Sequence, residues 1–299
     1  MPYYSFPPFK PQYFFPLEYK NHSFFKSFFQ PYSIIGRFSW LLWNKQSWVR
    51  KLFFLNNIEN YIPEKTIRNY IGYDALIAFN RGTPGPEQKV TALVESNKRR
   101  YFLKFGQTPT SAMLIENEAK ILKGLSSFKI APTLIEKWEG DDYILIKTEF
   151  LEGNRLCQII LTEEISDFLI QLSSIRIEAI NNYEGELKTG FAHGDFCPWN
   201  IMTLNDRICP YDWEMAGYYS LGYDIFTFIF QTNFLLFPQK TNDQILKENH
   251  VALERFFNSI DIFDWKPYLI AFAKLKVDNF KINAASKLYK KYKILLIES

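Results

Sequence analysis

The chain has 299 residues, of which 47% are hydrophobic and 22% charged, and its net charge is +3 at neutral pH. This composition is ordinary for a globular protein with a sizeable core. Its three cysteines, Cys157, Cys197 and Cys209, form no CxxC spacing, which argues against a disulfide framework and a structural zinc site and predicts a reducing compartment.

Residues 1–70 are rich in aromatic residues and proline and carry a basic excess. From Ile34 to Phe54, apolar residues recur at helical spacing with cations between them. One interpretation is a helix that lies on an anionic membrane. The other, which we favour, is a helix packed on the body of the protein, because amphipathic helices mostly face a core. We treat residues 1–70 as an N-terminal extension.

The sequence pattern of residues 71–149 predicts a small sheet with one helix. The run NRGTPGPEQK and the sequence SNKR are rich in turn-forming residues and separate apolar stretches. A helical repeat follows and ends before Pro132. The expected elements are strands at 75–79, 89–95, 100–105 and 143–151 and a helix at 111–125.

Residues 150–299 are predicted to be mostly helical from Thr162 onward, apart from the loops around 193–224. A strand-rich region followed by a helical one indicates an α+β fold. The longest later apolar stretch, Ile225 to Phe237, falls short of the roughly 20 residues that a membrane span needs. The N-terminus also lacks the pattern of a signal peptide, so we expect a cytoplasmic protein.

Five polar residues in the loops around 193–224 are candidate site residues. The segments HGDFCPWN, YDWE and SLGYDI place His193, Asp195, Asn200, Asp212 and Asp224 close together in sequence. Phosphoryl transfer needs a carboxylate to receive the proton of an acceptor hydroxyl and oxygen ligands for Mg²⁺ on the phosphates. An H-x-D-x-x-x-x-N sequence followed by a second aspartate supplies these groups.

HGDFCPWNIM and YDWE resemble the aminoglycoside phosphotransferase and choline kinase group, the small-molecule branch of the protein-kinase-like fold. The resemblance implies a bilobal fold with a small β-rich N-lobe at 71–149 and a larger helical C-lobe at 150–299. It also implies that Asp195 is the catalytic base and that Asn200 and Asp212 are metal ligands. His193 and Asp224 would brace the loop.

Upstream residues fit the same resemblance in the required order. Lys104 in YFLKF matches the strand lysine that contacts the α- and β-phosphates, and Glu118 in IENEAKIL matches its helix partner. Glu116 is the rival, but a position two residues away faces another direction on a helix. TEFLEG resembles the hinge between lobes, where adenine would bind to the backbone near Glu149 and Leu151. NRGTPGP takes the place of the phosphate-covering loop without a strict glycine pattern.

Several departures disfavour protein-kinase activity. Gly194 stands where protein kinases carry arginine, DWE replaces DFG, and no APE-type segment follows. CPWN replaces the more common HPGN. We expect Trp199 to pack beneath the loop rather than stack on a sugar, and Cys197 and Cys209 to be small fillers.

The leading hypothesis is a phosphotransferase that uses ATP, or GTP, and Mg²⁺ on a hydroxyl of a small molecule. The acceptor would be an amino alcohol, an aminoglycoside or a sugar-type compound, including one from cell-envelope carbohydrate or lipid metabolism. The alternative is a pseudokinase or nucleotide-binding adaptor that recruits a partner or membrane through its N-terminal region.

Other partners are predicted more weakly. The basic segments Ile34 to Phe54 and Lys274 to Lys293 suggest peripheral contact with an anionic membrane. No obligate protein partner is inferred. Nucleic-acid binding is disfavoured, because the basic residues follow no recognisable motif.

Overall fold

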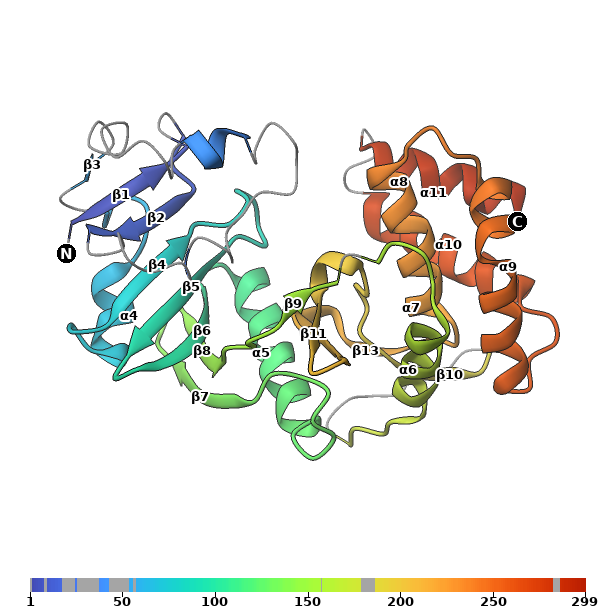
Figure 1. Cartoon of the computed structure of the whole chain (residues 1–299), viewed down its shortest axis with the longest axis horizontal. Helices are drawn as coiled ribbons and strands as arrows, with labels where there is room; N and C mark the ends of the chain where they lie inside the picture. Colours follow the sequence, from blue (N-terminus) through green and yellow to red (C-terminus); the bar gives the residue numbers. More distant parts are fainter. Residues whose placement is uncertain are drawn as a thin grey trace. The chain divides into compact units, whose positions relative to one another are not determined.

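A computed structural model describes residues 2–7, 10–17, 25, 38–42, 54–55, 58–156, 158–178, 186–281 and 286–299. The chain divides into two compact units (Figure 1). Unit 1 comprises residues 1–119 and 133–150, and unit 2 comprises residues 120–132 and 151–299. We had expected boundaries near residues 70 and 149. The division near 149 has a counterpart at Phe150, whereas the described part of residues 1–70 lies within unit 1.

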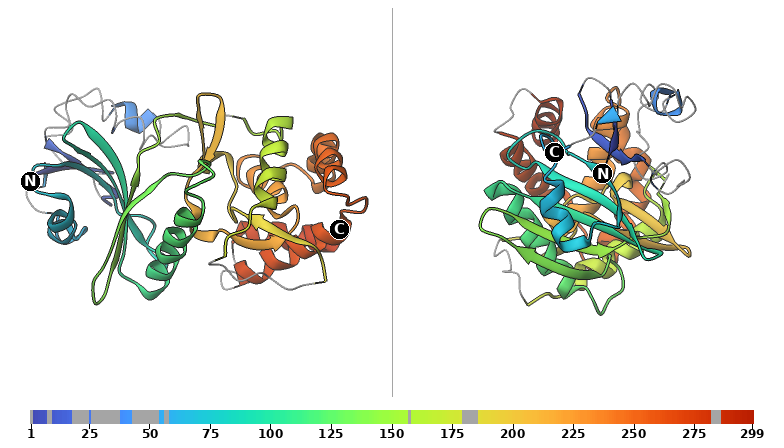
Figure 2. Two further views of the ribbon diagram at one scale, coloured as in Figure 1. Left: turned by 90° about the horizontal axis from the view of Figure 1, so that it is seen from below. Right: turned by 90° about the vertical axis from the view of Figure 1, so that its left-hand side faces the viewer.

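Unit 1 is built on an eight-stranded antiparallel sheet in the order β3-β1-β2-β4-β5-β6-β8-β7. Its strands are β1 (Tyr3–Phe6), β2 (Tyr13–Pro16), β3 (Phe54–Leu55), β4 (Leu76–Asn80), β5 (Lys89–Ser96), β6 (Arg99–Gly106), β7 (Leu134–Glu139) and β8 (Ile144–Glu149). Helix α4 (Glu64–Ile71) and most of helix α5 (Pro109–Gly124) belong to the same unit. The two helices lie on opposite sides of the sheet (Figure 2).

Apolar clusters cover both faces of this sheet. Successive side chains of a strand point to opposite faces, so neighbouring residues can belong to different clusters. In β4, Ile77 and Phe79 join one apolar cluster, while Ala78 between them joins another. The first cluster includes Ile67 of α4. The second includes Phe25 and Trp40 from the aromatic N-terminal region. The abundance of aromatic residues near the N-terminus thus has a structural use, which is to cover the second face of the sheet.

The predicted elements of unit 1 are confirmed. The expected strands 75–79, 89–95, 100–105 and 143–151 are β4, β5, β6 and β8, and the expected helix 111–125 is α5. Asn97 and Lys98 link β5 and β6 with positive φ angles of 51° and 62°, as in the two-residue turns that match the twist of a hairpin.

The N-terminal strands β1 and β2 were not predicted. The expected helix from Ile34 to Phe54 lies mostly outside the described residues. Within it, residues 38–42 are helical, whereas Phe54 is part of strand β3. The helix therefore does not extend to the predicted end.

Unit 2 is mostly helical, as predicted, with two small sheets. Its strands β10 and β13 pair with each other, and β12, β11 and β9 form the second sheet. The strands are β9 (Asn154–Arg155), β10 (Thr189–Ala192), β11 (Ile201–Leu204), β12 (Arg207–Pro210) and β13 (Gly217–Ser220). The helices are α6 (Glu163–Ser174), α7 (Tyr223–Phe226), α8 (Thr232–Leu236), α9 (Asn242–Ser259), α10 (Lys266–Phe280) and α11 (Lys287–Glu298), with a π-helical segment at Thr227–Gln231.

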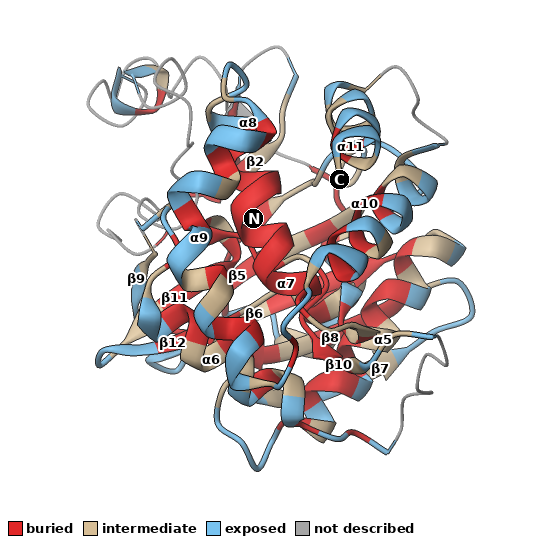
Figure 3. Ribbon diagram, turned by 90° about the vertical axis from the view of Figure 1, so that its right-hand side faces the viewer, coloured by how far each residue is buried: buried red, intermediate tan, exposed pale blue. Residues whose placement is uncertain are grey.

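The apolar stretch from Ile225 to Phe237 is buried in unit 2 as far as Phe234, whereas Leu235 and Leu236 are exposed. It spans the second half of α7, the π-helical segment and α8, and Figure 3 shows α7 buried while α9 and α10 expose their outer sides. Hydroxyl side chains cap the starts of α6, α9 and α11, and Thr241 forms a capping box with Gln244 at the start of α9. Among the described residues, no helix has the length and apolar character that a membrane span requires.

Candidate active site

The HGDFCPWN loop leaves strand β10 and enters β11 through a short 3₁₀ turn at Pro198–Asn200. Gly194 has a φ of 85°, a conformation that side chains other than glycine rarely adopt. A Cβ atom at this position would collide with the backbone carbonyl of Met215. The glycine of the motif is therefore required by the path of the loop.

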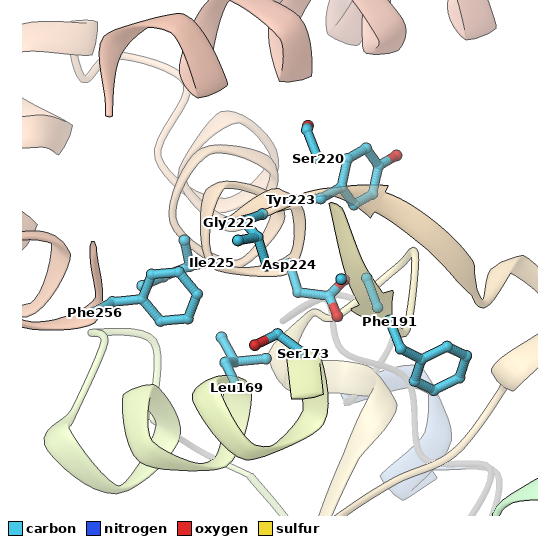
Figure 4. A pocket seen from close by; sticks show the side chains of 12 residues that line it. Leu169, Ser173, Phe191, Ser220, Gly222, Tyr223, Asp224, Ile225 and Phe256 are labelled. Atoms are coloured by element: carbon cyan, nitrogen blue, oxygen red, sulfur yellow. The ribbon is translucent and has the colours of Figure 1, made fainter. Parts of the chain in front are cut away.

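Asp224 anchors the start of the loop through hydrogen bonds to its backbone. Its carboxylate accepts hydrogen bonds from the backbone N–H groups of His193 (2.6 Å) and Gly194 (3.0 Å). Burial raises the pKa of Asp224 to about 7, against the opposing effect of these two bonds. A cavity of about 20 Å³ lies beside it (Figure 4). This cavity is too small for a substrate and belongs to the packing behind the loop.

The ring of His193 fixes the next turn of the loop. Its Nδ1 accepts a hydrogen bond from the backbone N–H of Asp195 (3.3 Å), so the ring proton lies on Nε2, which donates to the carbonyl of Tyr211 (3.0 Å). The ring also packs on Trp213, with 4.6 Å between ring centroids. His193 thus ties the HGD segment to the YDWE segment, as a bracing residue would.

Both carboxylate oxygens of Asp195 accept hydrogen bonds from side-chain amides. The Nδ2 of Asn200 donates to Oδ2 and to the backbone carbonyl of Asp195, each at 2.9 Å. The Nε2 of Gln231 donates to Oδ1 at 2.6 Å. The carboxylate at the centre of the motif is therefore held in one orientation.

Asn200 and Asp212 lie in adjacent segments, because the backbone N–H of Tyr211 donates to the carbonyl of Asn200 (2.9 Å). Asp212 has a left-handed backbone (φ 70°) and precedes the 3₁₀ turn Trp213–Met215. Carboxylate oxygens of Asp212 and Glu214 lie within 4.8 Å of each other. The Asn200 amide nitrogen is used by Asp195, which leaves its carbonyl oxygen for a cation. This set of oxygen donors fits Mg²⁺.

In unit 1, the sheet alternation turns Lys104 away from the core that holds its neighbours Leu103 and Phe105. Its Nζ lies 2.6 Å from Oε2 of Glu118 on α5, and both side chains are buried. Glu116 is paired instead with Lys137. The structure therefore makes the ion pair that the sequence predicted and not the rival one.

Glu149 ends strand β8, and its backbone N–H donates to the carbonyl of Thr133 (2.9 Å). Its side chain accepts a bond from the Thr133 hydroxyl (2.8 Å). Leu151, two residues on, is buried and begins the second part of unit 2. The predicted loop NRGTPGP connects β4 and β5.

The cysteines in the described segments do not add a nucleophile. Cys197 and Cys209 are both free and buried. Burial, and next the charge of Asp195, raise the pKa of the Cys197 thiol well above its ordinary value. Cys157 lies outside the described residues.

Residues 154–255 match the model of the phosphotransferase enzyme family. The match contains the HGDFCPWN and YDWE segments and confirms the predicted resemblance to aminoglycoside phosphotransferases. A comparison with proteins of curated function finds no significant match.

Solved structures share the fold. Amicoumacin kinase hAmiN, solved with AMP-PNP, Ca²⁺ and Ami, has a TM-score of 0.54 at 12% identity over 81% of this chain and 96% of its own. Aminoglycoside phosphotransferase APH(4)-Ia has a TM-score of 0.50 at 11% identity, covering 80% and 98%. A thermostable mutant of it, solved with ADP and hygromycin B, gives 0.50 at 12%, covering 78% and 97%. These likenesses confirm the predicted kinase-like α+β fold and, with the family match, support a small-molecule kinase.

Reasoning from sequence missed three residues around the site. Glu214 lies beside Asp212 and was noted only as an acid near it. Gln231 bonds to the Asp195 carboxylate, and Lys276 bonds to Gln231, both from helices far along the chain. The available signal was a glutamine inside the apolar stretch 225–237, which we read for its apolar length alone.

Proposed function

We propose that the protein transfers the γ-phosphoryl group of ATP to a hydroxyl of a small molecule, with Mg²⁺ as cofactor. The observation that carries this proposal is the Asp195 carboxylate, whose two oxygens are oriented by Asn200 and Gln231 within a family-matched catalytic motif. Phosphoryl transfer depends chiefly on such positioning and on electrostatic stabilisation.

In the proposed reaction, Asp195 accepts the proton of the acceptor hydroxyl as its oxygen attacks the γ-phosphorus. The bond between that phosphorus and the β–γ bridging oxygen breaks, and ADP leaves. Lys104, held by Glu118, would contact the α- and β-phosphates. Asn200 and Asp212, with Glu214 as a further candidate, would hold Mg²⁺, which supplies charge neutralisation on the phosphates when bound.

The remaining predicted residues have supporting roles in this proposal. His193 and Asp224 would keep the loop in place through the bonds described above. Adenine would bind to backbone groups near Glu149 and Leu151. Because the N–H of Glu149 already donates to Thr133, its carbonyl would be the group that contacts the base. The choice between ATP and GTP is open, so both nucleotides are tested.

The acceptor class comes from the fold neighbours and from the sequence. Neighbouring structures are an amicoumacin kinase and an aminoglycoside phosphotransferase solved with hygromycin B. We propose an amino alcohol, an aminoglycoside or a sugar-type acceptor, including one that occurs in cell-envelope metabolism.

The test is product formation with Mg²⁺ and ATP or GTP on a panel of aminoglycosides, choline, ethanolamine and sugars. Asp195→Asn should lower turnover by roughly 10²–10⁴-fold if the residue is a general base, and removal of Mg²⁺ by a chelator should abolish it. Unchanged turnover in Asp195→Asn would refute the assigned base. Tight binding of Mg-ATP with no turnover across the panel would favour the nucleotide-binding adaptor.

We also propose that the protein is cytoplasmic and that it contacts anionic membrane surfaces. Helix α11 carries four lysines and exposes Ile294 and Ile297, the latter with 75% of its surface accessible. A basic helix with exposed apolar side chains is typical of interfacial binding. Flotation with phosphatidylserine-containing vesicles tests this contact, and a chain that stays unbound at low salt would refute it.

A further inference from the structure

Gln231 is the polar residue that ends the π-helical segment Thr227–Gln231 in the buried centre of unit 2. It lies 36 positions after Asp195, yet its Nε2 donates to the Asp195 Oδ1 at 2.6 Å. π-Helical turns are rare and occur frequently at functional sites.

The orientation of the Gln231 amide is set by two donors on its other end. Its Oε1 accepts a hydrogen bond from the Lys276 Nζ (3.3 Å) and one from the Tyr292 hydroxyl (3.2 Å). An ammonium group can only donate hydrogen bonds. A flipped amide would therefore bring N–H groups against the ammonium and a carbonyl oxygen against the Asp195 carboxylate, so the donor must face Asp195.

Lys276 itself is fixed by its surroundings. It lies on helix α10 with 5% of its surface exposed. Its Nζ lies over the rings of Tyr223, Phe272 and Tyr292, at 4.9, 5.6 and 6.0 Å from their centroids. Cation–π contacts of this kind stabilise a desolvated ammonium. Among the described residues, its hydrogen bond goes to Gln231.

We propose that Gln231 is a positioning residue for the catalytic aspartate, and that Lys276 and Tyr292 position Gln231. This inference rests on the proposed function, in which Asp195 receives the acceptor proton. Gln231 holds Oδ1 while Asn200 holds Oδ2, so the rotation of the carboxylate is fixed from both sides. Oδ1 also accepts a long bond from the Cys197 thiol (3.8 Å), so Oδ2 is the oxygen that keeps a second lone pair for the acceptor O–H.

The activity test compares Gln231→Met, which keeps the length of the side chain but donates no hydrogen bond, with Asn233→Leu. Asn233 is the matched control because it is also buried on the same helical stretch and donates only within it, to the Ile229 carbonyl (2.7 Å). We expect Gln231→Met to lower kcat by roughly 10–100-fold, the effect of a misoriented reacting group. The KM for ATP should stay within about twofold, because no nucleotide contact is lost. Asn233→Leu should keep kcat.

Lys276→Met should change kcat in the same direction as Gln231→Met, and the double variant should lose little more than Gln231→Met alone, because the lysine acts through the glutamine. A kcat within twofold of wild type in Gln231→Met would overturn the inference. An equal loss in Asn233→Leu would also overturn it, because the effect would then be general loosening of the helix.

A second readout does not depend on turnover. In ¹⁵N-glutamine-labelled protein, the Gln231 side-chain N–H bonded to the carboxylate should resonate downfield of the other side-chain amides. The signal should lose this shift in Asp195→Ala, move in Lys276→Met and stay in Asn233→Leu. If no acceptor gives turnover, the proposed function fails and the amide signal alone decides. A Gln231 signal that ignores both Asp195→Ala and Lys276→Met overturns the inference.

Discussion

Gly194→Ala is the substitution for which the structure predicts the sharpest effect on the catalytic loop. The left-handed backbone of Gly194 (φ 85°) disfavours alanine by about 1–2 kcal/mol. In addition, the new Cβ would collide with the Met215 carbonyl, which belongs to the backbone and cannot rotate away. We therefore expect a loss of about 2–4 kcal/mol in the free energy of unfolding.

The same substitution should impair catalysis, because the displaced segment lies between His193 and Asp195. The loop must move away from Met215, which weakens the bond from the Gly194 N–H to Asp224. A displacement of about 1 Å at a reacting group lowers turnover by roughly 100-fold. Turnover is measured on the acceptor identified from the panel, and the free energy of unfolding by urea titration.

Gly217→Ala is the matched control. Gly217 lies in β13 without a positive φ, and a Cβ there would meet its nearest neighbour, a Tyr219 ring carbon, at an ordinary 3.6 Å. We expect its unfolding energy to change by less than about 0.5 kcal/mol. Equal stability and turnover in Gly194→Ala and Gly217→Ala would refute the reasoning about the loop.

Two further predictions concern buried charges. The pKa of Asp224 is raised from 3.8 to about 7, so its contribution to stability is complete below pH 4 and is lost as pH rises towards and through 7, by about 4 kcal/mol in total. Urea titrations at pH 5 and 8 should show about 2–3 kcal/mol of this loss in wild type and not in Asp224→Asn, and parallel pH profiles of the two proteins would contradict it. In unit 1, Arg68→Met should lower the unfolding energy by about 3–5 kcal/mol, because the buried Glu64 loses its 2.6 Å ion pair with the guanidinium. An unchanged denaturation midpoint would show that the Tyr3 hydroxyl, 2.6 Å from the same carboxylate, suffices.

Local patterns in the sequence predicted the elements whose signals are local. Strands β5 and β6 alternate apolar residues around a turn at Asn97 and Lys98, and both the alternation and the turn can be read over a few residues. The Lys104–Glu118 pair could also be predicted from the sequence, because the family resemblance supplied the order of the two residues and helix geometry excluded Glu116. Asp195 and Asn200 could be predicted to lie close together in the same way, because they are only five positions apart in the HGDFCPWN segment.

The elements that were missed depend on distant partners. Strand β1 contains Tyr3 and Tyr4 next to prolines, and nothing local distinguishes it from an extended arm. It becomes a strand because β2 pairs with β4, more than 60 positions along the chain, and because Phe25 and Trp40 cover the outer face. Such long-range pairing leaves no periodic signal in one sequence.

A similar sequence separation lies between the HGDFCPWN motif and the residues that orient Asp195. Asp195 can be found from seven neighbouring letters, whereas Gln231 and Lys276 lie 36 and 81 positions later in segments that look like helix cores. Burial among Tyr223, Phe272 and Tyr292 raises the free-energy penalty for any misaligned polar group, because interactions there are less screened than in water. A single arrangement of the Asp195, Gln231 and Lys276 side chains is then strongly preferred. The aromatic residues around this network therefore act on the Asp195 carboxylate indirectly, by restricting the orientations that its hydrogen-bond partners can adopt.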